Sequence, residues 1–440
     1  MSIDTFYPVS EEELSFDEAK DILKNNEWPI MLRTPRGHRY FFSEPIDIIS
    51  PENIKVSVNT DINKLQGNPS LIDLENTWRK FVSRTRLSKK SGNVTDYVAP
   101  IAFTVIPFNP NAALSWWTSR GGPFIYIPGL TLVQSNTRST LIKIEKNVEP
   151  TSQKWGIKAY IEETNHVSTD FLTYAKALEQ AKEYMHESEL QKLVLARKKV
   201  IELNKVPKGP TIFKALCQTQ PNTYAFTIGR NDYLFFGASP ELILRARGRH
   251  LYSRPLAGSR GVSPVTDTHR AAKELRQSLK DKREHKYVTD WVSATFLSFG
   301  GLCVVPEPKV ARFSSIMHLS TPIHAYLPNP IGILQVLNRL HPTPAIAGSP
   351  VEAASKLISQ LETFSRGWYG GLVGIIDAKA QGEFALAIRC AKLEINIVSM
   401  YAGAGVLPES YAESEWDETS AKLRAVENAI YAAQNLQYVD

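Results

Sequence analysis

The sequence predicts an α+β fold, in which antiparallel sheets pack against helices. Residues 171–190 and 271–297, and the chain from Glu415 onward, carry apolar residues at helical spacing. Other segments are short runs rich in valine, leucine and isoleucine, and residues 372–406 hold several of these runs in succession. The strict alternation of strand and helix that builds a parallel sheet is missing. We therefore expect groups of antiparallel strands with long helices between them.

The composition indicates a globular protein. The chain has 440 residues, 43% hydrophobic and 22% charged, which is enough for one large core or two ordinary ones. Lysine and arginine exceed aspartate and glutamate by 51 − 45 = 6, which suits either an ordinary solvated surface or a basic pocket for an anionic small molecule. Cys217, Cys303 and Cys390 are far apart and odd in number, as in proteins of a reducing cytosol. The chain opens with no charged-then-apolar leader, and no apolar run nears the ~18 residues of a membrane span, so we expect a cytoplasmic protein.

A polar stretch at 145–170 separates a first third rich in proline and aromatic residues from a more regular remainder. This stretch is either a domain boundary or a surface connection inside one large fold. After it, residues 171–190 predict a helix, and QKLVLARKKV at 191–200 predicts a strand because it is short and rich in valine and leucine. A second helix is expected over 271–297.

Residues 372–406 predict an antiparallel meander of three short strands. The turn signals lie at Ala378–Gly382 and near Glu394. We expect the segment AGAG at 402–405 to form a turn after the third strand, where its N–H groups could bind an anion. The glycine spacing is not that of a dinucleotide fingerprint, because no helix opens within it.

An acidic segment, ESEWDETSAKL at 413–423, predicts the start of the last helix. Glu415, Glu418 and Lys422 line up beside an apolar stripe formed by Trp416, Leu423, Val426 and Ile430. Acids in a first turn complement the helix dipole by ~0.3–1 kcal/mol each, which is one explanation for them.

A second pair of acids, Asp281 and Glu284, stands at i and i+3 in the segment DKREHKYVTDW. Glu284 extends the apolar stripe of that helix, so it is expected to point inward, where a carboxylate must be paired or bound to metal. Two helices that offer inward carboxylates would make an oxygen-only site suited to Mg²⁺. The alternative is that Glu284 pairs with one arginine or lysine. No histidine–cysteine cluster has the spacing of a zinc site.

Two residues are candidates for acid–base chemistry. Lys192 lies on a strand of apolar residues, and burial disfavours the charged form of a lysine, as a general base requires. The alternative is a strand-end lysine that reaches solvent. Glu241 follows FFGASP at the mouth of an aromatic strand, where an apolar environment would raise its pKa and make it an acid.

Arg389 is a candidate for binding a carboxylate. We place it on a strand face shared with Ala385, Ala387 and Ala391, which are too small to fill the space around a guanidinium. A buried structural ion pair is the alternative explanation.

Several segments together resemble one enzyme family. They are KLVLAR, FFGASPELILR, PLAGSR, DKREHKYV, MHLSTPI, HPTPAIAGSP, GEFALAIRCAK, YAGAGV and EWDETSAKL. Their order and approximate spacing resemble those of the chorismate-utilising enzymes, and they look most like isochorismate synthases. The resemblance is strong from about residue 166 onward and faint before it, where IPFNP and IPGLTLV are only suggestive.

The resemblance implies the fold of anthranilate synthase component I, an α/β sandwich of two packed antiparallel sheets with helices outside. It implies one chorismate-binding domain over 1–440, with a variable N-terminal part at 1–165 and the catalytic motifs at 166–440. The polar stretch at 145–170 would then be a connection within this domain.

The resemblance also implies roles for particular residues. Lys192 matches the general base that activates water, and Glu241 matches the general acid that protonates the departing hydroxyl. Glu284 and Glu415 match direct or water-bridged Mg²⁺ ligands, with Asp281 and Glu418 close by. The positions that match substrate-binding residues are Tyr369 and Arg389 at the enolpyruvyl carboxylate, Gly403 and Lys422 at the ring carboxylate, and Gly258, Ser259, His318, Ala345 and Ile388 in the pocket.

The activity implied is the Mg²⁺-dependent conversion of chorismate to isochorismate, by addition of water at C2 and loss of the C4 hydroxyl. Such an enzyme is an isomerase without a redox cofactor, nucleic-acid partner or glutaminase subunit, and we expect it to be a monomer. Its product can serve siderophore, salicylate or menaquinone biosynthesis, depending on the partner enzymes. A chorismate-binding or nucleic-acid-binding protein without turnover would lack Lys192 or Glu241, or carry a basic stripe with interleaved aromatics, and neither is found.

A few positions separate the members of the family. Anthranilate synthases usually carry glutamine in place of Lys192, and aminodeoxychorismate synthases typically carry lysine in place of Ala257. Salicylate synthases, which go on to eliminate pyruvate, are the alternative: they share Lys192 and Glu241 but tend to have threonine at Ala345 and LRA in place of IRC. Tyr369 is shared with members that eliminate pyruvate, whereas Ala345 is not.

Overall fold

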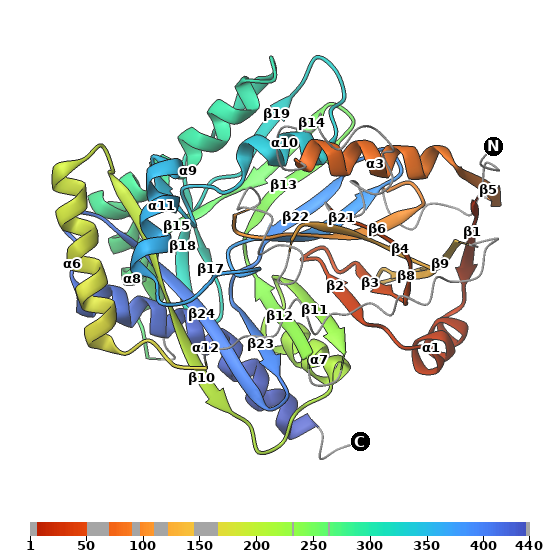
Figure 1. Cartoon of the computed structure of the whole chain (residues 1–440), viewed down its shortest axis with the longest axis horizontal. Helices are drawn as coiled ribbons and strands as arrows, with labels where there is room; N and C mark the ends of the chain where they lie inside the picture. Colours follow the sequence, from red (N-terminus) through yellow and green to blue (C-terminus); the bar gives the residue numbers. More distant parts are fainter. Residues whose placement is uncertain are drawn as a thin grey trace, which may run out of the picture.

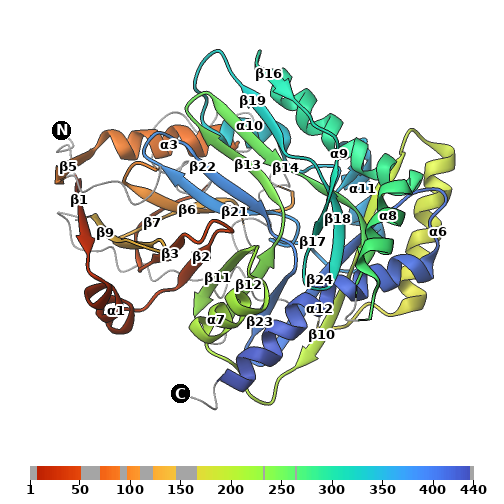
Figure 2. The same cartoon turned by 180° about the vertical axis from the view of Figure 1, so that it is seen from behind.

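The computed structural model describes residues 7–50, 70–89, 97–109, 122–144, 166–230, 233–262 and 265–436. Two large sheets pack face to face, and helices cover them from outside (Figures 1 and 2). Within the described residues the strand pairs are antiparallel except for β1 and β5, which run parallel at one edge. The predicted α+β fold with two packed antiparallel sheets is therefore confirmed.

The larger sheet has twelve strands in the described part of the chain. In spatial order they are β20 (Gly348–Ser349), β10 (Lys192–Glu202), β24 (Ile397–Val406), β23 (Cys390–Glu394), β12 (Tyr233–Ser239), β11 (Tyr224–Arg230), β2 (Ile30–Arg33), β3 (Arg39–Phe42), β8 (Leu130–Gln134), β9 (Ser139–Ile144), β1 (Tyr7–Leu14) and β5 (Thr85–Lys89).

The second sheet has nine strands in the same described ranges. In spatial order they are β16 (Leu302–Val304), β19 (Ile323–Tyr326), β14 (His250–Arg254), β13 (Leu242–Arg247), β22 (Gly382–Leu386), β21 (Leu372–Asp377), β6 (Ile101–Ile106), β7 (Phe124–Pro128) and β4 (Pro45–Ile49). A small sheet that the sequence did not predict joins β15 (Leu256–Gly261), β18 (Ile316–Ser320) and β17 (Lys309–Arg312).

Successive side chains along the strands of the twelve-stranded sheet point to opposite faces, and both faces are covered by an apolar layer. In β3, Tyr40 and Phe42 belong to the core between the sheets, whereas Phe41 faces the opposite layer. In β12, Phe235 faces the core between the sheets and Phe236 the opposite layer. Because side chains alternate with a period of two, each strand can serve both layers.

Helices close both outer faces. Helix α12 (Ala412–Leu436) runs along β24 beside α7 (Gly209–Thr219), as Figure 1 shows. The other helices are α1 (Phe16–Asn25), α3 (Leu71–Ser83), α6 (Phe171–Glu187), α8 (Thr268–Gln277), α9 (Leu279–Leu297), α10 (Ile333–Leu340) and α11 (Val351–Leu361). No helix in the described ranges is long and apolar enough to cross a membrane.

The helix expected over 271–297 is two helices. Helix α8 ends and α9 begins at Ser278, whose N–H donates to Glu274 O at 3.0 Å and whose Oγ accepts from Asp281 N at 3.2 Å. The serine therefore acts as an N-cap in the middle of an apolar periodicity that continues past it. The other expected elements are found with small shifts, as α6, β10 and α12.

The segment 372–406 is not a three-stranded meander. It forms four strands, and β21 and β22 lie in the nine-stranded sheet, whereas β23 and β24 lie in the twelve-stranded sheet. The predicted turns at Ala378–Gly382 and near Glu394 are both present, but the connection at 387–389 was missed because no glycine, proline or asparagine marks it. The AGAG segment at 402–405 is also not a turn: it lies within β24 and pairs with β10.

Strands from the two sides of the polar stretch share both sheets. In the twelve-stranded sheet β2 pairs with β11, and in the nine-stranded sheet β6 pairs with β21. Residues 145–165 of the stretch itself, and Pro110 of the IPFNP segment, lie outside the described residues.

A buried carboxylate joins two helices of this scaffold. Glu75 of α3 is fully buried and accepts hydrogen bonds from Leu334 N at 2.9 Å and Gln335 N at 3.3 Å, at the N-terminus of α10. Gln335 Nε2 and Arg79 complete its partners at 2.9 Å and 3.0 Å. Gly332 is required beside it, because a methyl group there would overlap the carboxylate.

We predict that Glu75→Ala lowers the free energy of unfolding by ~1–3 kcal/mol, because buried N–H donors would lose their acceptor. Urea denaturation would measure the change. The control is Glu179→Ala, which removes an exposed pair with Lys182 and should cost less than ~0.5 kcal/mol. Equal losses in the two variants would show that Glu75 does not hold α10.

Candidate active site

Two neighbouring connections carry the chain from one sheet to the other. The first, between β12 and β13, contains Pro240 and Glu241, and the second, between β22 and β23, contains residues 387–389. The two connections hydrogen-bond to each other, from Ala238 N to Arg389 O at 3.0 Å and from Leu386 N to Glu241 O at 3.1 Å. They therefore bring Glu241 and Arg389 together at the place where the sheets part.

This arrangement corrects the expected setting of Arg389. The residue is not on a strand face with Ala385, Ala387 and Ala391, because the chain changes sheets there and the alternation is broken. Arg389 adopts a positive φ of 51°, which is rare for a residue other than glycine. Among the described residues it forms no ion pair with a carboxylate, and its side-chain partner there is His318.

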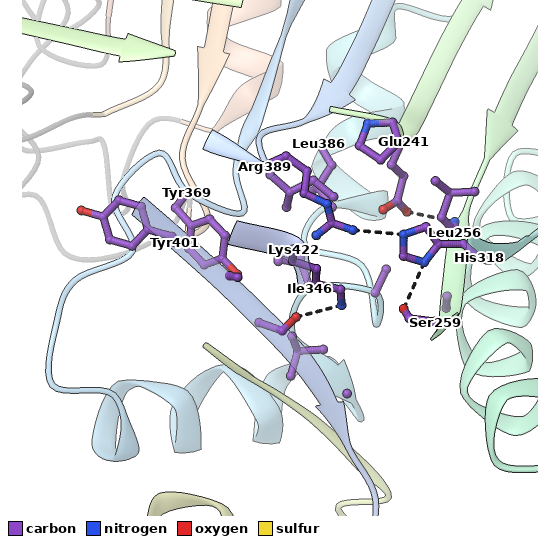
Figure 3. Close-up of a pocket in the computed structure, with 18 of the residues that line it drawn as sticks. Glu241, Leu256, Ser259, His318, Ile346, Tyr369, Leu386, Arg389, Tyr401 and Lys422 are labelled. Atoms are coloured by element: carbon purple, nitrogen blue, oxygen red, sulfur yellow. Dashed lines mark hydrogen bonds between the residues drawn. The ribbon is translucent and has the colours of Figure 1, made fainter. Parts of the chain in front are cut away.

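A pocket opens at these connections, and most of the predicted site residues line it. These are Glu241, Ser259, Glu284, His318, Ala345, Tyr369, Ile388, Arg389, Gly403 and Lys422. In Figure 3, Tyr369 and Tyr401 lie on one side of the pocket and Glu241, His318 and Ser259 on the other, with Arg389 and Lys422 between them.

The remaining predicted residues lie behind this lining. Lys192 contacts Glu284, Asp281 packs against Gly258, and Glu415 and Glu418 are paired with lysines. The lining residues that were not assigned to the site from the sequence are Val194, Pro240, Leu256, Ala257, Ile346, Leu386, Tyr401, Ala402 and Gly405. All nine stand in segments that carried the family resemblance, so the signal was the segment and not the individual side chain.

Glu241 is placed as a carboxyl that can hold a proton at neutral pH. It is buried, and burial raises its pKa to about 7, against the opposing effects of a hydrogen bond from Leu256 N at 3.3 Å and of the positive charge of Arg389. A carboxyl with a pKa near the working pH is suited to donating a proton to a departing group.

Lys192 is fully buried, so the alternative of a lysine that reaches solvent is wrong. Its Nζ lies 3.1 Å from Glu284 Oε1, an ion-pair contact without the alignment of a hydrogen bond. Gly405 makes this contact possible, because a Cβ there would overlap the Glu284 carboxylate. Burial raises the pKa of Glu284, but the charges of Lys192 and Lys422 outweigh it and leave the pKa lowered.

Arg389 is oriented by a chain of polar contacts. Its Nη2 lies 3.0 Å from His318 Nε2, and His318 Nδ1 lies 3.0 Å from Ser259 Oγ. Because a guanidinium can only donate, Nε2 accepts and His318 carries its proton on Nδ1. Burial, aided by the charge of Arg389, lowers the pKa of His318 well below its ordinary value, so the ring stays neutral. Burial also lowers the pKa of Arg389 to about 10, which leaves it charged at neutral pH.

The acids of α9 and α12 face a set of lysines. Lys280 Nζ lies 2.5 Å from Glu415 Oε1, and Lys422 Nζ lies 2.5 Å from Glu418 Oε1 and 2.9 Å from Gly403 O. Burial and the charge of Glu418 raise the pKa of Glu415 to about 7. Lys280 was missed in the sequence, although it stands four residues before Glu284 on the same helix face.

These carboxylates fit a hard cation by their chemistry. They offer only oxygen, the ligand atom that a hard cation prefers, and burial together with repulsion from Glu284 and Glu418 raises the pKa of Asp281. Within the described ranges, however, no three acidic, histidine or cysteine side chains are already arranged around one metal position. A cation would have to replace Lys280 at Glu415 and Lys192 at Glu284.

Comparison with known proteins identifies the family. The isochorismate synthases MenF and DhbC of Bacillus subtilis strain 168 are 35% and 36% identical to the chain over 260 and 268 residues, which is 58% of this chain in each case. The matched parts span 55% and 67% of those relatives. Anthranilate synthase component I from Streptococcus pneumoniae shares the fold, with a TM-score of 0.65 and 19% identity over 94% of this chain and 97% of that chain.

The model of a family described as "Chorismate binding enzyme" matches residues 30–431, which include the nine-stranded sheet, the twelve-stranded sheet except β1, and every residue of the pocket described above. The chain therefore belongs to the chorismate-binding enzyme family.

Proposed function

We propose that the protein is an Mg²⁺-dependent isochorismate synthase, which adds water to C2 of chorismate and expels the C4 hydroxyl. The observation that carries this proposal is Glu241, a buried carboxyl whose pKa of about 7 lets it hold a proton beside two cations, Arg389 and Lys422, of one pocket. The names of the relatives in Bacillus subtilis agree with this reaction.

The charges of the pocket suit the substrate. Chorismate carries two carboxylates, and a buried anion requires a paired cation. Arg389 with Tyr369 would hold the enolpyruvyl carboxylate, and Lys422 with Gly403 would hold the ring carboxylate. Arg389 already carries the positive charge that this role requires, because it stays protonated at neutral pH.

Proton transfer is assigned to Lys192 and Glu241. Lys192 would take a proton from the attacking water, and Glu241 would give one to the departing C4 hydroxyl, so that the ring double bonds shift between the two positions. Lys192 Nζ contacts the Glu284 carboxylate. A cation bound at Glu284 would take the place of this contact and leave the lysine to face the attacking water.

Mg²⁺, when bound, would be this cation and would neutralise the ring carboxylate of the substrate. Glu284 and Glu415 would hold it, with Asp281 and Glu418 near it. The nucleophile is water and not ammonia, so we expect a monomeric, cytoplasmic enzyme that needs no glutaminase subunit.

The product is tested by incubating the protein with chorismate and Mg²⁺ and separating the products by chromatography. We expect isochorismate as the main product, because Ala345 and the segment around Ile388 resemble members that do not eliminate pyruvate. Coupled lactate dehydrogenase would measure pyruvate in the same mixture. Pyruvate released in step with chorismate consumption would make the protein a salicylate synthase.

We predict that Lys192→Gln and Glu241→Gln each lower kcat by ~10²-fold or more, because general acid–base catalysis usually contributes a rate factor of this size. Matched controls are Lys198→Gln, a buried lysine on the same strand, and Glu383→Gln, a buried glutamate paired with Arg245 away from the pocket. Steady-state kinetics on chorismate would measure the effect. Near-normal turnover of either catalytic variant would remove that residue from the mechanism.

Activity should vanish in EDTA and return with Mg²⁺ but not with Zn²⁺, because the proposed ligands all offer oxygen. Glu284→Ala and Glu415→Ala should raise the Mg²⁺ concentration needed for half-maximal activity far more than Asp281→Ala. Titration of activity with Mg²⁺ measures this ordering. Full activity in metal-free buffer would exclude the metal site.

A further inference from the structure

Arg366 lies outside the pocket but is bonded to two of its walls. Its Nη1 donates to Ile346 O at 2.7 Å, and its Nη2 donates to Val194 O at 2.7 Å. Val194 and Ile346 both line the pocket, on strand β10 and on the segment before β20 respectively. One buried guanidinium therefore sets the spacing of two walls that are distant in the sequence.

Glu362 fixes this guanidinium from behind. Its carboxylate accepts from Arg366 Nε at 2.8 Å and from Arg366 Nη2 at 2.5 Å. It also accepts from Ala196 N at 2.8 Å, two residues after Val194 on β10. The two side chains are 3% and 1% exposed, so water cannot replace these bonds.

The same unit supports Tyr369. The guanidinium of Arg366 lies 5.7 Å from the centre of the Tyr369 ring, and Tyr369 N donates to Arg366 O at 2.8 Å. Gly370, with a φ of 74°, lets Ile346 approach so closely that a Cβ there would lie 2.7 Å from Ile346 Cγ1. Ile346, Tyr369 and Val194 are thus all joined to Arg366, and we call these three lining residues together the Arg366-supported wall.

We propose that Arg366 is a positioning residue that determines the product by holding the Arg366-supported wall in place. This inference rests on the proposed function, in which Tyr369 lies at the enolpyruvyl carboxylate. Isochorismate loses pyruvate when the hydrogen on C2 moves to the enolpyruvyl methylene and the C3–O bond breaks, which leaves salicylate and needs no other reactant. A fixed wall holds the enolpyruvyl group away from C2 and so stops the reaction at isochorismate.

The test is the ratio of pyruvate released to chorismate consumed by Arg366→Lys. Lysine keeps the charge for Glu362 but not the planar fork that reaches both carbonyls. We expect the ratio to rise about tenfold over the unmodified protein, because a loosened wall admits more than one substrate geometry. This ratio does not depend on how much of the variant is folded, since unfolded chains make neither product.

Glu362→Gln is the second variant, and it should raise the ratio in the same direction because it weakens the hold on Arg366. Its matched control is Glu75→Gln, another buried glutamate paired with an arginine at i+4, which supports α10 and does not line the pocket. The control should leave the ratio unchanged.

The outcomes separate the inference from the proposed function. If the unmodified protein makes no isochorismate, the proposed function fails. If it makes isochorismate and the ratio stays unchanged in Arg366→Lys and Glu362→Gln, the role of Arg366 is wrong and the residue only stabilises the fold. A ratio that rises equally in Glu75→Gln would also overturn it, because loosening any buried ion pair would then suffice. Should Arg366→Lys fail to fold, Glu362→Gln decides.

Discussion

The pocket depends on one steric and hydrogen-bonding constraint, the reciprocal bonding of the two connections between the sheets. The bonds from Ala238 N to Arg389 O and from Leu386 N to Glu241 O hold both connections side by side. Gly237 is required at this contact, because a Cβ there would lie 2.7 Å from Cys390 Cβ and 2.8 Å from Arg389 O. The strands diverge from this point into two sheets, and Glu241 and Arg389 line the pocket that opens there.

The balance of charge around this space explains why so many ionisable groups are tolerated inside the protein. Lys192, Lys280 and Lys422 each lie within 3.1 Å of a carboxylate of α9 or α12. Arg389, in contrast, has a neutral histidine as its partner and keeps its charge for a ligand. A buried cation without a carboxylate is costly, and an anionic substrate would remove that cost. The pocket lining thus carries both signs of charge, with Arg389 and Lys422 beside Glu241 and Glu284, and Lys192 lies behind Glu284.

The sequence predicted local structure well and spatial contacts less well. The inward direction of Glu284 followed from the apolar stripe of its helix, and Glu284 does line the pocket. The strand setting of Arg389 was wrong, because periodicity shows where a strand is but not the sheet to which the next strand belongs. The AGAG segment was read as a turn, since glycine more often signals a turn than the close approach of another side chain. There, the glycines make room for Glu284 and for the Tyr369 hydroxyl. From the sequence, the pairing of Glu284 with a lysine was only an alternative to a metal site. Lys192 and Glu284 are about ninety residues apart, and the sequence does not show which distant segments meet.

The order of strands in the larger sheet has a consequence for how the protein is made. The neighbours of β10 include β24, and β23 separates β24 from β12, so the hairpin at 390–406 is inserted between strands that are synthesised much earlier. Until the ribosome has released this hairpin, β10 and β12 have unpaired edges, and such edges are prone to aggregate. Non-local pairing of this kind also slows folding. The strands that carry Lys192 and Glu241 are thus joined in one sheet only when nearly the whole chain has been translated. A chain truncated before this hairpin would lose the scaffold of the whole pocket.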